Sequence, residues 1–223
     1  MPPKLETSDL TALRDGTPIV DGVSIAVAKA EVLAVVGPSG AGKSSLLRLL
    51  NRLDEPTEGT VLIDGTDYRE LPPTELRCRI GFVPQEPGLR NGTVAENVTI
   101  GPRLRDRTVS DEAVDRLLSR VDLDGYASRD VSTLSGGEAQ RVAIARTIIT
   151  EPEVVLLDEP TASLDADAEA RVEGLFTDLI TESDLTCVLV THDRDQARRL
   201  ADRVAVFEDG RVTAVGDIGT VIA

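Results

Sequence analysis

The chain has 223 residues, with 39 acidic against 24 basic side chains and a formal net charge of −15, which argues against nucleic acid as a partner because phosphate contacts need a basic surface. No apolar run approaches the ~18 residues that a membrane-spanning helix needs. The first residues also lack the apolar segment of a signal peptide, so we expect a cytoplasmic protein.

The basic residues are unevenly divided, since only three of the 24 are lysine and the rest are arginine. An acidic, lysine-poor chain resembles the cytosolic proteins of extreme halophiles, in which salt screens the self-repulsion of the folded state. An ordinary acidic protein from a GC-rich genome is the alternative. The two cysteines, Cys78 and Cys187, fit no metal-ligand spacing and are expected to be reduced thiols.

The first 31 residues alternate loosely between apolar and polar. The run from Val23 to Val27 predicts a strand, and Asp21-Gly22 predicts a turn before it. We expect this segment to belong to a small antiparallel layer.

The stretch 32–50 combines a buried strand, a glycine loop and an apolar helix. Its loop fills the pattern G-x-x-x-x-G-K-[ST], which cradles nucleotide phosphates in this strand–loop–helix context. The helix N-terminus adds its positive dipole end. Lys43 is expected to reach the β- and γ-phosphates, and Ser44 to ligate Mg²⁺. The nucleotide-binding residues predicted here are Gly37, Pro38, Ser39, Gly40, Ala41, Gly42, Lys43, Ser44 and Ser45.

After this helix, residues 61–63 predict a strand with a hairpin turn at Asp64-Gly65, and residues 79–85 predict a short strand that ends in a loop. Residues 86–133 then change pattern. Helices are predicted at 94–98 and at 110–121, the second with Ser110 as its N-cap. We expect this segment to be a helical lobe inserted into an α/β core.

A second anion site is predicted where Ser135, Gly136 and Gly137 open a helix over 135–149. Free amide groups, a hydroxyl and the helix dipole favour a phosphate there. One chain does not need two γ-phosphate sites. The second therefore makes sense if it serves the nucleotide of another subunit.

Two carboxylates follow a buried strand over 154–157. Open α/β sheets bind ligands at the carboxyl ends of their strands. Asp158 is expected to complete the Mg²⁺ site with Ser44, and Glu159 to orient or deprotonate the attacking water.

The remaining pattern alternates helices and buried strands, with a helix at 167–180, a strand at 187–190, a helix at 194–201 and a hairpin over 204–215. Such alternation predicts a mostly parallel sheet. The predicted fold is therefore α/β, with one domain spanning residues 1–223.

The motif L-S-G-G-E at 134–138, in order after the phosphate loop and before L-L-D-E, resembles the signature of ATP-binding-cassette ATPases. The same order continues with Ser163-Leu164-Asp165 and with a strand that ends at His192. The resemblance covers nearly the whole chain, and it implies a P-loop NTPase that binds ATP and Mg²⁺.

The resemblance also implies roles for single residues. Gln85 would contact Mg²⁺ and the attacking water and would sense a transmembrane partner. His192 would contact the γ-phosphate and hold Glu159 and Asp165 in place, with Asp165 at a dimer interface. Ser135 and Gly137 would close on the ATP bound by a second copy of the chain.

Two departures from the family pattern stand out. The family usually offers an aromatic residue near Arg14 to stack on adenine, and the segment 10–16 has none, so the Arg14 guanidinium could stack instead. Ala30 stands where family members often carry glycine, so that turn could differ in detail.

By this resemblance the chain is the ATPase subunit of a transporter, with two copies in a head-to-tail dimer on separate permease chains at the inner face of the cell membrane. Residues 86–94 are the expected permease contact. Two alternatives remain: a non-transport cassette ATPase acting in DNA repair or on ribosomes, and a small-molecule kinase, which would leave L-S-G-G-E unexplained.

The cargo is left open by the sequence. The chain resembles ATPases of phosphate importers, and it also resembles the small ATPases paired with iron exporters. Phosphate or another inorganic ion, or a metal such as iron, is therefore expected, with import and export both open.

Overall fold

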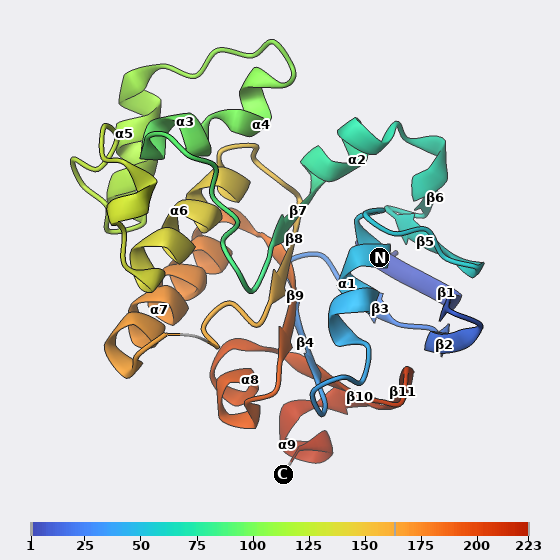
Figure 1. Ribbon diagram of the computed structural model, residues 1–223. Coiled ribbons are helices and arrows are strands. Elements are labelled where there is room, and N and C mark those ends of the chain that lie inside the picture. The colour runs from blue at the N-terminus through green and yellow to red at the C-terminus, as the bar shows by residue number, and fades with distance from the viewer. Residues whose placement is uncertain (1, 163, 223) are drawn as a thin grey trace.

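The computed structural model describes residues 2–162 and 164–222. Its larger sheet has six strands and runs through the middle of the molecule (Figure 1). In spatial order the strands are β11 (Arg211–Asp217), β10 (Arg203–Glu208), β4 (Val32–Val36), β9 (Thr186–Thr191), β8 (Val154–Asp158) and β7 (Ile80–Val83). All neighbours are parallel except β11, which pairs antiparallel with β10. The predicted mostly parallel α/β core is confirmed.

A second, antiparallel sheet lies beside this core. Its strands are β2 (Thr17–Val23), β1 (Leu5–Arg14), β5 (Glu58–Ile63) and β6 (Thr66–Asp67), with β3 (Ala26–Val27) paired to β1. The small antiparallel layer predicted from the first residues is therefore present. The hairpin predicted at Asp64-Gly65 is also present, between β5 and β6.

The predicted strand over Val23–Val27 is present only in part, because Val23 ends β2 and Ala26–Val27 forms β3, and the predicted turn at Asp21-Gly22 is wrong. The structure places Asp21 and Gly22 inside β2, next to a register shift against β1. The chain then leaves the sheet before β3 begins. The Thr7 hydroxyl occupies this break, because it donates to the Val23 carbonyl (2.8 Å) and accepts from the Ile25 amide (3.0 Å).

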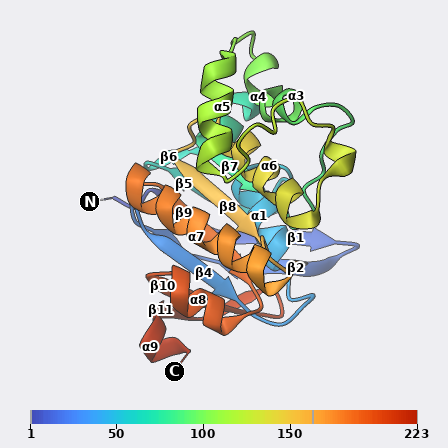
Figure 2. The ribbon, with the colours of Figure 1, turned by 90° about the vertical axis from the view of Figure 1, so that its left-hand side faces the viewer.

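Helices cover both faces of the six-stranded sheet (Figures 1 and 2). The principal helices are α1 (Lys43–Leu50), α2 (Pro73–Arg79), α3 (Val94–Val98), α4 (Ile100–Arg103), α5 (Asp111–Arg120), α6 (Gly136–Ile148), α7 (Ala166–Ser183), α8 (Arg194–Leu200) and α9 (Ile218–Val221). Two short 3₁₀ turns, η1 (Tyr68–Glu70) and η2 (Val131–Thr133), are also present. The sequence patterns predicted neither β1 nor α2.

Two large apolar cores result from this arrangement. The first lies between the antiparallel sheet, α1 and one face of the central sheet, and it includes Leu10, Leu46, Val61 and Val188. The second lies on the other face and includes Leu118, Val142, Phe176 and Leu189 from α5, α6, α7 and β9. Because α1 and α7 pack on opposite faces, the loops at the carboxyl ends of the strands are fixed from both sides.

The segment between β7 and α6 contains α3, α4, α5 and η2, as the helical pattern of residues 86–133 predicted. Two of these helices begin at capping residues. Thr93 and Glu96 form a reciprocal capping box on α3, and the Ser110 hydroxyl accepts from the Ala113 amide at the start of α5. Each helix in the described part of the chain is too short or too polar to span a membrane.

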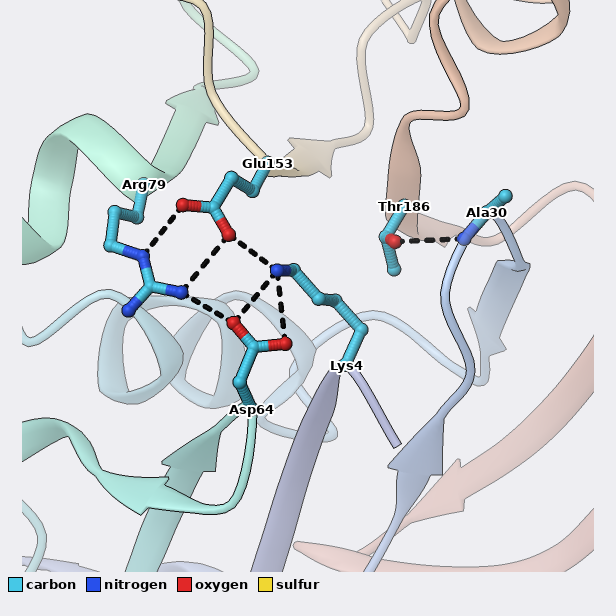
Figure 3. A network of polar contacts seen from close by, with 6 residues as sticks. All are labelled: Lys4, Ala30, Asp64, Arg79, Glu153 and Thr186. Carbon is cyan, nitrogen blue, oxygen red and sulfur yellow. Dashed lines mark hydrogen bonds and ion pairs between the residues drawn. The ribbon is translucent and has the colours of Figure 1, made fainter. Parts of the chain in front are cut away.

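Four charged side chains join the two sheets at the end where the parallel strands begin (Figure 3). Lys4 precedes β1, Asp64 lies in the β5–β6 turn, Arg79 ends α2 and Glu153 precedes β8. Lys4 Nζ lies 2.8 Å from Asp64 Oδ2 and also pairs with Glu153, and Arg79 Nε lies 2.7 Å from Glu153 Oε1. We call these four residues the basal ion cluster.

Candidate functional site

The loop between β4 and α1 is shaped by two of its glycines. Gly42 has a φ of 105°, and a Cβ there would come within 2.2 Å of the Ile19 carbonyl oxygen. A Cβ at Gly37 would lie 1.9 Å from the Phe207 carbonyl oxygen. Larger residues at these two positions would therefore displace β2 and β10.

Lys43 begins α1, and its ammonium turns back over this loop. Its Nζ donates to the carbonyl oxygens of Gly37 (2.8 Å) and Pro38 (3.0 Å), and its side chain is only 4% exposed. The Glu159 carboxylate lies 3.8 Å from Nζ. The ammonium is thus held in the loop by two carbonyl groups and by the more distant Glu159 carboxylate.

Ser44 and Asp158 meet as predicted, although they lie far apart in the sequence. The Ser44 hydroxyl donates to Asp158 Oδ1 at 2.8 Å. Burial raises the pKa of the Asp158 carboxyl, against the hydrogen bond from Ser44 and the attraction of Lys43. The pair brings a hydroxyl and a carboxylate together at the carboxyl end of β8.

Glu159 and His192 form a second pair at the same edge of the sheet, because β8 and β9 are parallel neighbours. His192 Nδ1 lies 2.9 Å from Glu159 Oε2. A carboxylate can only accept, so Nδ1 carries the hydrogen. Glu159 has a φ of 43°, a strained conformation for glutamate that surrounding contacts must enforce. One of them is the hydrogen bond from its amide to the Val190 carbonyl (2.9 Å).

A pocket of about 520 Å³ opens beside Lys43. Of the predicted site residues, it is lined by Arg14, Ser39, Gly40, Ala41, Gly42, Lys43, Ser44, Ser45, Gln85 and Glu159. Gln85, which follows β7, lines this pocket together with the phosphate loop. A pocket that joins a glycine loop, a buried ammonium and a carboxylate fits a nucleotide with its phosphates at Lys43.

The comparison with protein families decides the assignment. A family model described as "ABC transporter" matches residues 20–162. The chain belongs to the ABC transporter family.

Curated relatives agree over most of the chain. It is 46% identical to ABC transporter I family member 17 of Arabidopsis thaliana, over 96% of this chain and 82% of that protein. It is 42% identical to the methionine import ATP-binding protein MetN of Caulobacter vibrioides (93% and 64%), and 43% identical to the phosphate import ATP-binding protein PstB 2 of Natronomonas pharaonis (91% and 76%). The chain thus spans just under two thirds of MetN.

Solved structures share the fold. The cbiO1 protein of Clostridium perfringens, part of the ABC transporter complex cbiONQ, matches with a TM-score of 0.88 and 31% identity over 99% of this chain and 91% of that chain. The dimeric structure of the transporter cassette MJ0796 matches with a TM-score of 0.86 and 31% identity, over 96% and 98%. The chain is an ATPase subunit of the ABC transporter family.

The residues of the L-S-G-G-E motif lie apart from the pocket beside Lys43. Ser135 caps α6, since its hydroxyl accepts from the Glu138 amide and its amide donates to Glu138 Oε2 (2.7 Å). A Cβ at Gly137 would come 2.9 Å from Ala168 Cβ, so the starts of α6 and α7 are closely packed. Gly136 also lies at this junction, and none of the three lines the pocket beside Lys43.

The segment after Glu159 is described except for Ser163, which lies outside the described residues. Asp165 is the N-cap of α7, and its Oδ1 accepts from the Ala168 amide at 2.9 Å. No described contact links Asp165 to His192, so that predicted contact stays a prediction.

Four further residues of this ABC cassette line the pocket beside Lys43 and were not predicted. Pro18 and Ile19 come from β2, and Asp209 and Gly210 come from the β10–β11 turn. The Gly210 amide donates to the Ala41 carbonyl (3.0 Å), which brings that turn against the phosphate loop. The sequence does indicate a turn at Asp209-Gly210, but only the register of the folded sheet places it at the site.

Proposed function

We propose that two copies of this chain bind head to tail with two ATP molecules between them, and that they drive solute movement through separate permease chains. The observation that supports this most is the separation of the signature residues from their own nucleotide pocket. A pocket closed by Ser135, Gly136 and Gly137 of a second copy would explain both sites, and the MJ0796 relative is described as dimeric.

In this proposal the chain's own residues divide the work of ATP hydrolysis. The Lys43 ammonium binds the β- and γ-phosphates. Glu159 accepts a proton from the attacking water, and His192 holds that carboxylate through their 2.9 Å contact while reaching the γ-phosphate. Gln85, which lines the same pocket, orients the water.

We also propose a Mg²⁺ site at Ser44, Asp158 and Gln85. The fit rests on the donor set, because the Ser44 hydroxyl and the Asp158 carboxylate already lie 2.8 Å apart and Gln85 adds an amide oxygen. Hard oxygen ligands of this kind suit Mg²⁺, which usually takes few protein ligands beside substrate phosphates. When bound, the ion would neutralise charge on the phosphates.

Arg14 is the proposed contact for the base. It lines the end of the pocket formed by the tip of the β1–β2 hairpin, beside Pro18 and Ile19, and no aromatic side chain lines this pocket among the described residues. A planar guanidinium can stack on a purine ring.

We propose that the chain, residues 1–223, is one ABC domain and that residues 86–133 form its helical lobe. Residues 86–94 are the proposed contact for a permease at the inner face of the cell membrane. The cbiO1 relative supports this, since it is described as part of a transporter complex. Copurification of a polytopic membrane protein would support the coupling, and stable association with DNA or ribosomes would contradict it.

The proposed cargo is phosphate or another inorganic ion, or a metal such as iron. One relative is named as a phosphate importer, another as a methionine importer. The cassette itself does not bind the solute. Identification of the permease encoded beside this chain would therefore test both the cargo and the direction of transport.

We further propose that the chain is adapted to high salt. The support is its charge of −15 and its three lysines among 24 basic residues.

The Glu159→Gln variant tests the proposed mechanism. We expect ATP turnover to fall by on the order of 100-fold or more, since a general base is lost, while ATP binding persists and an ATP-bound dimer accumulates. Phosphate release and light scattering after gel filtration measure the two effects, with Glu75→Gln on α2 as the control. Rapid hydrolysis by Glu159→Gln would show that Glu159 is not the general base.

The Arg14→Ala variant tests the proposed contact with the base. Unchanged ATP affinity of this variant would exclude Arg14 as that contact.

A further inference from the structure

A buried polar network lies behind the Glu159–His192 pair. Its centre is Gln196 in the first turn of α8, which is 2% exposed. The Gln196 amide donates to Thr161 Oγ1 (2.7 Å) and to Glu173 Oε1 (2.9 Å). Thr161 and Glu173 are 7% and 9% exposed, so both amide hydrogens of Gln196 are used inside the protein.

The network joins the segments that follow the two proposed catalytic groups. Thr161 lies two residues after Glu159, and Gln196 lies four residues after His192. Between His192 and Gln196 the chain is fixed, because Asp193 caps α8 and its amide donates to Thr191 Oγ1 (3.0 Å). The Glu159–His192 contact and the Thr161–Gln196 contact therefore tie the same two segments together twice.

Glu173, the third residue of the network, connects it to α7. Glu173 accepts from Arg199 through both carboxylate oxygens, from Nε at 2.9 Å and from a terminal guanidinium nitrogen at 2.7 Å. Arg199 also lies 3.7 Å from Glu169. Helix α7, which carries Glu173, has Asp165 as its N-cap and packs against the start of α6. The network is thereby anchored to α7, the helix that approaches the proposed dimer face.

The network supports a strained residue, because the backbone of Glu159 has a φ of 43°. Such a conformation persists only where its surroundings over-determine it. We propose that Gln196 is a positioning residue for hydrolysis: its amide holds the loop after Glu159 against the helix after His192 and so keeps the carboxylate and the imidazole in register. The inference rests on the proposed ATPase mechanism, in which those two groups act on the attacking water.

Gln196→Leu tests the proposal by removing both hydrogen bonds at similar volume. The kcat for ATP hydrolysis is expected to fall on the order of 10- to 100-fold, because misplacement of a catalytic group by about 1 Å has effects of this size. The KM for ATP should change less than about twofold, since the phosphate loop is untouched. Asp195→Ala is the matched control on the same helix, because Asp195 is exposed and its one ion pair among the described residues is with Arg198; its kcat should equal that of the wild type.

If Gln196→Leu fails to fold, a second pair of variants that exchanges the carboxylate and the amide between positions 173 and 196 tests the same proposal. Gln196→Glu places a second carboxylate against Glu173 and should lower kcat about tenfold or more, because like charges in a buried site repel. Adding Glu173→Gln restores one carboxylate and one amide, and most of the lost kcat should return. Loss of packing alone would not be repaired by a second substitution of this kind.

The outcomes separate the two proposals. A wild type without ATP hydrolysis would overturn the proposed function and this inference with it. Hydrolysis by the wild type, with unchanged kcat in Gln196→Leu and Gln196→Glu, would overturn the inference alone. So would a double variant that folds and remains as slow as Gln196→Glu.

Discussion

At the scale of single residues, Ala30 shows what one methyl group does to a turn. Its φ is 59°, in the left-handed region, where the Cβ of an ordinary residue is strained and glycine is not. The conformation is imposed by the fold, because the Ala30 amide donates to Thr186 Oγ1 at 3.0 Å and so fixes the turn before β4 (Figure 3). The alanine noted in the sequence thus adopts a glycine-like backbone.

Ala30→Gly is therefore expected to stabilise the protein. Relief of the strain should exceed the added backbone entropy of the unfolded chain, so the free energy of unfolding should rise by about 0.5–1 kcal/mol. The midpoint of urea unfolding measures the change. Ala28→Gly is the control: Ala28 has no positive φ, so the same substitution there should lower the midpoint. A lower midpoint for Ala30→Gly would contradict the strain argument.

At the scale of elements, the basal ion cluster joins the antiparallel sheet to the parallel one. The hydrogen bond from Arg79 lowers the pKa of Glu153 to about 2, against partial burial and with help from Lys4. Because this folded-state pKa is below the ordinary value, the ionised carboxylate stabilises the fold above about pH 4.5. That contribution is lost as the pH falls toward 2.

Glu153→Gln should consequently lower the urea midpoint at pH 7, and the difference from the wild type should shrink as the pH falls from about 4.5 toward 2. Unfolding titrations at a series of pH values and fixed salt measure both effects. Glu151→Gln, in the same loop and with no ion pair among the described residues, should show neither. A difference for Glu153→Gln that persists undiminished at the lowest pH would contradict an ionic origin.

The elements also show which parts of the fold the sequence could predict. Local apolar runs predict the buried strands β8 and β9, and capping residues predict the helices α5 and α6. These elements led to the predicted site residues Asp158, Glu159 and Ser135. In contrast, β1 was missed because its buried positions change alternation near Asp9, whose φ is 48°. The lining by Ile19 and Asp209 depends on sheet register, which no local pattern specifies.

At the scale of the whole molecule, two electrostatic effects of opposite sign compete. The net charge of −15 makes the compact state repel itself. Local ion pairs such as Arg120–Glu182 (2.8 Å) and Arg48–Asp54 (2.7 Å) oppose this, but exposed pairs each contribute roughly 0–1 kcal/mol or less. Salt weakens both, so the response to salt reports which one dominates.

We expect repulsion to dominate, so that the isolated chain is stable in molar KCl and loses structure in dilute buffer. The screening length falls from about 10 Å at 0.1 M to about 3 Å at 1 M, which removes most long-range repulsion. Circular dichroism and thermal unfolding between about 0.05 and about 3 M KCl measure the change in structure and stability over this range of screening. Because screening is nearly complete by about 1 M, the steepest gain in stability should come below that concentration; a gain confined to higher salt would indicate salting-out of apolar surface instead. Circular dichroism and a midpoint that are unchanged in dilute buffer would contradict the proposed adaptation to high salt.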